Sequence, residues 1–219
     1  MGVDKRALIA EFLGTFGLIF MGAGAIVISG PRVGLLGIAL AHGLAIFLGV
    51  SFSGHLSGGH LNPAVTAAFM ATKRMEPNVG LAYIFSQLLG GIVAAILLWS
   101  VAPAGIRTGV PEPGQGVGWV GLILVEAILT FFLVFVIFGT CVDPRSPAKA
   151  IFPLCIGMTI TMDILAGGPL TGAAMNPARA FGPALVGMVW TKHLGYWIGP
   201  ILGGVAAGLL YDKMLMEKK

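Results

Sequence analysis

Two short asparagine motifs hold the residues of this chain best suited to binding a small solute. The tripeptide Asn-Pro-Ala stands at Asn62, Pro63 and Ala64 and again at Asn176, Pro177 and Ala178. Proline fits the first position of a helix and asparagine the cap before it, so each copy predicts a helix start. An asparagine that caps its own helix through its oxygen leaves its amide N–H groups free to donate to a solute. The copies differ in the next residue, which is Val65 in the first and Arg179 in the second.

The composition places these motifs in a membrane. Of 219 residues, 57% are hydrophobic and 10% charged, and the mean hydropathy is +0.94. Soluble domains carry about 25% charged residues, so this chain is expected to lie in a lipid bilayer. The net charge of +4 comes from basic residues at the ends of apolar runs, which argues against a nucleic-acid partner. No metal-binding cluster or nucleophile with a base is evident, so neither a cofactor or metal nor enzymatic activity is expected.

Apolar runs predict six membrane-spanning helices and two shorter helices. The expected spans are residues 7–28, 33–53, 80–101, 119–140, 150–168 and 195–211. Two further apolar segments, 63–72 and 177–187, are too short to cross a bilayer and begin at the asparagine motifs. They are predicted to be re-entrant half-helices, which membrane proteins tolerate where they line an internal cavity.

An internal duplication organises these elements. The heptapeptide AEFLGTF (10–16) resembles VEAILTF (125–131), so that Glu11 lies 51 residues before Asn62 and Glu126 lies 50 residues before Asn176. Each half holds three spans, and because three is odd the second half is expected to be inverted in the membrane. We therefore expect one all-α channel domain over 1–219, with inverted repeats at about 5–105 and 118–212 joined by loop 106–117.

Electrostatics suggests what such a site would pass. Inverted half-helices bring two helix N-termini together, and each carries roughly half a positive charge from its aligned peptide dipoles. A neutral solute such as water can accept hydrogen bonds from Asn62 and Asn176, whereas a cation or a migrating proton is repelled. An arginine at membrane depth is costly, so Arg179 needs a functional or structural reason.

These features resemble the aquaporin, or major intrinsic protein, family, on the segments SGGHLNPAVT and TGAAMNPARAFGP and on both glutamate-bearing helices. The resemblance covers about residues 5–212. It implies a pore in each subunit, a homotetramer and passage of water. It also implies an outer selectivity filter formed by His42, Ile164, Ala173 and Arg179.

That quartet is similar to the filter of plant tonoplast intrinsic proteins, as is the segment ILAGGPLTGAAMNPARAFGPAL. The implied cargo is water together with small neutral solutes such as ammonia or hydrogen peroxide. A glycerol or urea facilitator is the weaker alternative, because Ala180 and Ala184 replace the aspartate and the basic residue of glycerol channels. A secondary transporter also uses inverted repeats, but it would need a coupling-ion site.

Other polar residues in the apolar segments have expected structural roles. Glu11 and Glu126 are expected to accept hydrogen bonds from the loops before the half-helices. His60 is expected to anchor the first loop near the inner pore mouth. Asp163 precedes Ile164 within an apolar helix and is expected either to tune His42 or to brace the second loop.

Flanking charges predict the orientation of the chain. Nine lysines and arginines fall on the side that carries both termini and three fall on the other side. The positive-inside rule therefore predicts a multi-pass protein of the cell membrane with both termini in the cytoplasm.

Overall fold

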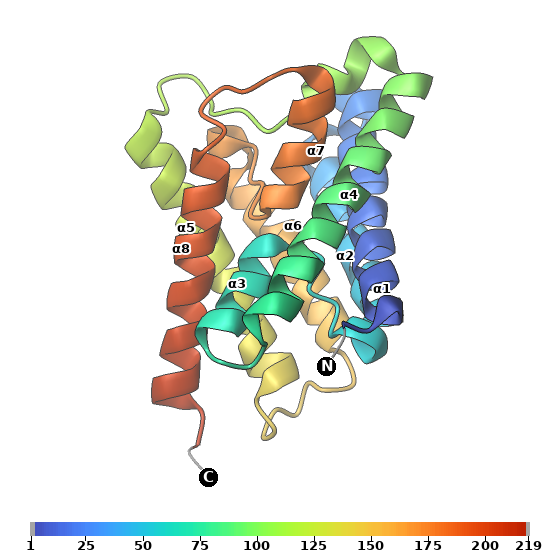
Figure 1. Cartoon of the computed structure of the whole chain (residues 1–219). Coiled ribbons are helices and arrows are strands. Elements are labelled where there is room, and N and C mark those ends of the chain that lie inside the picture. Colours follow the sequence, from blue (N-terminus) through green and yellow to red (C-terminus); the bar gives the residue numbers. More distant parts are fainter. Residues whose placement is uncertain (1–2, 218–219) are drawn as a thin grey trace.

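The computed structural model describes residues 3–217, and over that range it contains helices and connecting loops without strands (Figure 1). Six helical segments are long and apolar enough to cross a membrane: Lys5–Arg32, Gly34–Ser57, Pro77–Val101, Trp119–Val142, Phe152–Thr171 and Gly195–Leu215. The prediction of an all-α protein with six spans is confirmed. The first and last spans extend beyond the predicted bounds because their helices continue through the polar residues that follow the apolar runs, at 29–32 and 211–213.

The long helices pack in pairs that repeat between the two halves of the chain. Helix α1 (Lys5–Gly17) packs along α4 (Pro77–Val101), and α5 (Trp119–Ile137) packs along α8 (Gly195–Leu210). Helix α2 (Gly34–Ser57) packs along α6 (Phe152–Thr171) and so joins the halves. Glycines allow these close approaches because they have no side chain. Close packing matters here because lipid supplies no hydrophobic drive between helices.

The first span is not a uniform α-helix. After α1 it continues through π-helical turns at Leu18–Ala23 and Ala25–Ser29 and ends in a 3₁₀ turn at Gly30–Arg32. Gly22 lies in the wider part, where an added Cβ would be 2.6 Å from Cδ2 of His42. The absence of a side chain at Gly22 therefore makes room for the imidazole.

Two short helices complete the bundle. Helices α3 (Pro63–Ala71) and α7 (Pro177–Gly187) enter from opposite sides, and their N-terminal ends meet in the middle of the molecule (Figure 1). Helix α3 belongs to the first half of the chain but packs on α8, while α7 packs on α4. This exchange of short helices holds the two motifs together at the centre.

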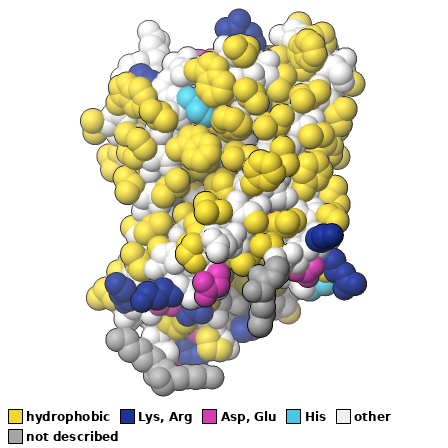
Figure 2. All heavy atoms as spheres, in the orientation of Figure 1, with side chains coloured by type: hydrophobic (Ala, Val, Ile, Leu, Met, Phe, Trp, Pro, Cys, Tyr) yellow, Lys and Arg dark blue, Asp and Glu magenta, His cyan; other side chains and the backbone are white. Residues whose placement is uncertain are grey.

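The outer surface matches a bilayer. Hydrophobic side chains cover the middle of the visible face, and lysines and arginines gather at its two ends (Figure 2). Both termini lie on one side, called the termini side below (Figure 1). There Arg145 pairs with Asp143 at 2.6 Å and holds the pKa of that carboxyl well below its usual range. Arg74 pairs with Asp212 at 2.6 Å and so connects the α3–α4 loop to the end of the last span.

Candidate functional site: a pore between two half-helices

Each motif asparagine caps its own half-helix. Oδ1 of Asn62 accepts a hydrogen bond from the backbone N–H of Ala64 at 2.8 Å. Oδ1 of Asn176 accepts from Ala178 at 2.9 Å and from Arg179 at 3.2 Å. The caps satisfy N–H groups that would otherwise lack partners, and Pro63 and Pro177 occupy the first helical positions. Both amide nitrogens therefore point away from their own helices.

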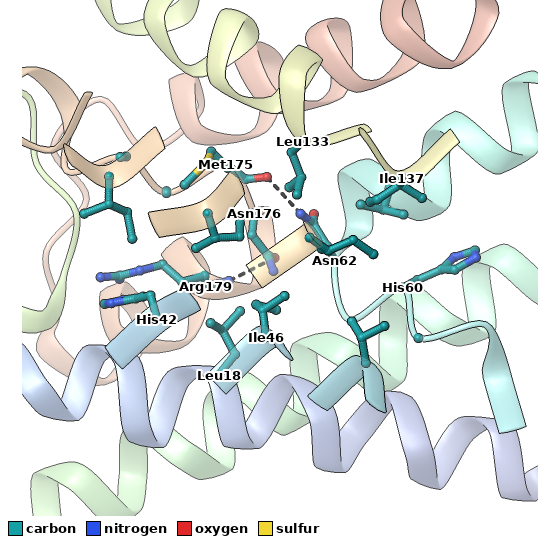
Figure 3. Close-up of a pocket in the computed structure, with 18 residues that line it drawn as sticks. Leu18, His42, Ile46, His60, Asn62, Leu133, Ile137, Met175, Asn176 and Arg179 are labelled. Carbon is teal, nitrogen blue, oxygen red and sulfur yellow. Dashed lines mark hydrogen bonds between the residues drawn. The ribbon is translucent and has the colours of Figure 1, made fainter. Parts of the chain in front are cut away.

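The amide nitrogens connect the two halves of the chain. Nδ2 of Asn62 donates to the carbonyl oxygen of Met175 at 2.9 Å (Figure 3). Nδ2 of Asn176 donates to the carbonyl oxygen of Leu61 at 2.8 Å. A side-chain amide carries two N–H donors, so each asparagine has one further N–H for a solute. This reciprocal arrangement places two donors side by side, next to the positive ends of α3 and α7.

Strained loops precede both asparagines. Leu61 and Met175 have positive φ angles of 51° and 52°, which L-residues rarely adopt. Buried glutamates hold these turns: Glu11 accepts from the backbone N–H groups of His60 and Leu61 at 2.9 and 2.6 Å. Their hydrogen bonds offset the strain and aim the carbonyls of Leu61 and Met175 across the centre.

The second loop has the matching support. Glu126 accepts hydrogen bonds from the N–H groups of Ala174 and Met175 at 3.0 and 2.7 Å and from the Thr171 hydroxyl at 2.7 Å. Neither Glu126 nor Glu11 exposes any surface, and neither lines the central cavity. The structure thus places both glutamates behind the pore wall.

A narrow cavity runs past both asparagines between the half-helices and the long helices (Figure 3). His42 and Arg179 lie at one end of it, Asn62 and Asn176 near its centre, and His60 at the other end. Its remaining wall is mainly aliphatic, from Leu18, Ile46, Val50, Val65, Leu133, Ile137, Ile156 and Ile160. A solute in the cavity meets polar groups at three levels, separated by apolar wall.

The four predicted filter residues all line this cavity. Arg179 is 3% exposed, and its Nη1 donates to the carbonyl oxygen of Gly109 at 2.7 Å. Nδ1 of His42 lies 2.9 Å from the Ile38 carbonyl oxygen, which can only accept, so Nδ1 carries the proton. Ile164 and Ala173 supply no side-chain donor, so the polarity at this end rests on His42 and Arg179.

The sequence did not predict every residue that takes part in the site. Gly109 holds the filter arginine from the loop between α4 and α5, and a backbone carbonyl has no sequence signal. That loop also packs near α6, where Gly114 donates to the carbonyl of Leu170 at 2.8 Å. For Asp163, no hydrogen bond among residues 3–217 supports either of the two expected roles. Its side chain forms no hydrogen bond with His42 or with the second loop, and Oδ2 is buried without a partner among residues 3–217.

Comparison with known proteins agrees with this geometry. Residues 3–211 match the family described as major intrinsic protein. Aquaporin TIP4-4 of Zea mays is 44% identical over 221 residues, covering 97% of this chain and 88% of that relative. Probable aquaporin TIP3-2 of Arabidopsis thaliana is 44% identical over 225 residues, covering 96% and 84%. The resemblance to tonoplast intrinsic proteins is therefore confirmed.

A solved structure shares the fold. The X-ray structure of the aquaglyceroporin from Plasmodium falciparum superposes with a TM-score of 0.82 at 28% identity, covering 96% of each chain. Because these matches run through both halves of the chain and both asparagine motifs, the protein belongs to the major intrinsic proteins, the aquaporin family of multi-pass membrane channels.

Proposed function

We propose that this protein is a passive channel for water and for small neutral solutes such as ammonia or hydrogen peroxide, and that it excludes protons and ions. The observation that carries the proposal is the pair of asparagine amides at the opposed N-termini of α3 and α7, facing one cavity. These donors hold the oxygen of a central water, whose protons then point away from the positive helix ends. A continuous proton-conducting chain through the centre is thereby disfavoured.

The outer filter supports a solute range wider than water alone. At the level of Arg179 the opposite wall is Ile164 and Ala173, which leave polarity on one flank only. A small solute can donate to Nε2 of His42, accept from Arg179 and rest against the apolar flank. Ammonia and hydrogen peroxide both donate and accept, so they suit this arrangement.

A glycerol or urea facilitator is the second candidate, and the likeness to the aquaglyceroporin structure from Plasmodium falciparum favours it. Against it, Ala180 and Ala184 are buried apolar residues at the two positions where glycerol channels carry charge. A triol also needs several hydrogen-bonding partners in the filter, whereas the quartet here supplies two polar side chains.

Stopped-flow light scattering on vesicles holding the purified protein tests the proposal. We expect osmotic shrinkage at least about tenfold faster than in empty vesicles, with no added proton leak by an internal pH dye. Ammonia should enter faster than in empty vesicles, and glycerol should not. Slow, saturable or gradient-coupled water movement would contradict a channel, and fast glycerol entry would favour the facilitator.

Mercurial sensitivity offers a separate check on the position of Ala173. This residue is 2% exposed and lines the cavity, whereas Cys141 and Cys155 do not line it. Low mercury concentrations are therefore expected to leave water flux unchanged in the natural protein and to block most of it in Ala173→Cys. Removal of the mercury by excess thiol should restore the flux. Block of the natural protein would instead implicate the two native cysteines.

The same proposal includes an inverted duplication, a homotetramer and both termini in the cytoplasm. The relatives are tonoplast intrinsic proteins, which favours a vacuolar membrane over the cell membrane predicted from sequence. Crosslinking in native membranes should give a four-chain species. A protease added from the cytoplasmic side should remove a tag from either terminus, and imaging of a fluorescent fusion identifies the membrane.

A further inference from the structure

A chain of buried polar groups lies behind the end of the pore that is nearer the termini side. Nδ1 of His60 is 3.1 Å from Oγ1 of Thr66, and the same hydroxyl accepts from Nε2 of Gln87 at 3.1 Å. Gln87 also donates to Glu11 at 2.7 Å. His60 is 6% exposed, and Thr66 and Gln87 are fully buried. The proposed channel function uses His60 as pore lining but leaves this chain unexplained.

The contacts of Thr66 determine where the His60 proton lies. The Thr66 hydroxyl is 3.1 Å from the carbonyl oxygen of Asn62, which can only accept, so the hydroxyl proton points there. The Gln87 amide nitrogen can only donate and occupies one lone pair of Thr66. All three contacts are hydrogen bonds only if Nδ1 of His60 donates to the remaining lone pair. In the other neutral tautomer the Thr66 hydroxyl would have to turn its proton from the Asn62 carbonyl to Nδ1, and one of the three hydrogen bonds would be lost.

Nε2 of His60 is then an acceptor. It forms no hydrogen bond with any residue in the described range 3–217, and His60 lines the cavity, so its lone pair is available to a solute. Packing fixes the plane of the ring, because its centroid lies 4.4 Å from that of Phe69 and 5.6 Å from that of Tyr83. A 180° flip of the imidazole would keep this packing but would turn Nδ1 away from Thr66 and lose that contact.

The second half of the chain shows that the half-helix itself does not require this arrangement. Helix α7 begins with the same asparagine cap and the same glutamate support as α3. Yet Ala180 stands four residues after Asn176, where Thr66 follows Asn62, and Ala174 stands two residues before it, in place of His60. Because an equivalent half-helix forms without a threonine and a histidine at these positions, Thr66 and His60 are not needed to form α3. We therefore assign them a role at the pore end where they lie.

We propose that Thr66, supported by Gln87, is a positioning residue that holds His60 as the Nδ1–H tautomer, so that the inner pore end presents a hydrogen-bond acceptor to passing solutes. The proposal rests on the channel function proposed above and specifies its selectivity. His42 is oriented in the same way by Ile38 at the opposite end. The pore thus has a histidine acceptor at each end, beside Arg179 at the outer end, and the two asparagine donors between them, which fits a water file whose protons point outward from the central asparagines.

Thr66→Val tests the proposal, since valine keeps the shape and removes the acceptor. Magic-angle-spinning ¹⁵N NMR of histidine-labelled protein in lipid reports the tautomer, with His60→Gln used to assign the signal. We expect Nδ1–H in the natural protein and in Thr66→Ser. In Thr66→Val the preference for this tautomer should fall by about fivefold, the worth of one buried hydrogen bond. Water flux should fall in parallel, by about twofold or more.

Thr66→Ala guards against misfolding, because alanine is the residue that α7 carries at this position. It should reproduce the tautomer shift of Thr66→Val with an unchanged elution profile in detergent. Nε2–H or a doubly protonated ring in the natural protein would overturn the proposal, as would an unchanged tautomer in both variants. A tautomer shift without loss of flux would overturn the role in conduction. A natural protein without water flux refutes the channel instead, which is a distinguishable result.

Discussion

Replacing the filter arginine should open the pore to cations. In Arg179→Val, methylammonium uptake into vesicles is expected to rise on the order of a hundredfold, and urea entry should rise as well. A cation passing about 5 Å from Arg179 in an effective dielectric of about 20 meets a repulsion of roughly 3 kcal/mol, and the variant lacks it. Valine is also smaller than arginine, so the substitution widens this side of the cavity and removes its hydrogen-bond donor. Radiolabelled uptake at fixed membrane potential measures the change.

Arg32→Val is the matched control for this result. Arg32 ends the first span on the same side of the membrane, is exposed, and does not line the central cavity. The same loss of one positive charge there should leave methylammonium uptake within twofold of the natural protein, in keeping with screening of exposed charges. Equal methylammonium uptake by both variants would mean that surface charge controls entry. Unchanged methylammonium and urea uptake in Arg179→Val would show that Arg179 is not part of the filter.

The fold could be predicted because its main determinants are periodic and local. Apolar runs of about 20 residues fix the number of spans, and proline after asparagine marks each half-helix start. The form of the first span could not be predicted in the same way, since α1 continues as π-helical turns to Ser29. No local sequence signal predicts these wider π-helical turns. They are coupled to a residue distant in sequence, because the absence of a side chain at Gly22 leaves room for the His42 ring of α2.

The site residues that use their side chains could be predicted from the sequence, whereas those that use a backbone carbonyl could not. Asn62, Asn176 and Arg179 stand out in sequence by residue type and spacing. The carbonyls of Leu61, Met175 and Gly109 perform as much of the hydrogen bonding, yet every residue has a carbonyl. Leu61 and Met175 also adopt positive φ without being glycine, so neither their type nor their spacing indicates the turn.

Close glycine contacts between the long helices are expected to be essential for the stability of the fold. An added Cβ on Gly203 of α8 would overlap the carbonyl oxygen of Ala127 on α5, and one on Gly90 of α4 would overlap that of Phe12 on α1. Each carbonyl follows a loop-holding glutamate by one residue. Gly203→Val is therefore expected to push α8 from α5 and to destabilise the fold by about 3 kcal/mol or more. Thermal unfolding in detergent, followed by size-exclusion chromatography, measures the loss of folded protein.

Gly17→Val separates this clash from a general intolerance of valine in these helices. Gly17 ends α1, and apart from its chain neighbours and its own helix backbone nothing lies within 4 Å of an added Cβ, so the variant should be as stable as the natural protein. Gly90→Val should behave like Gly203→Val, since its obstacle is also a backbone oxygen that no side-chain rotation can move. Normal stability of either variant would mean that the helix pairs can separate without loss of the fold. The glutamates would then hold the loops without help from close helix packing.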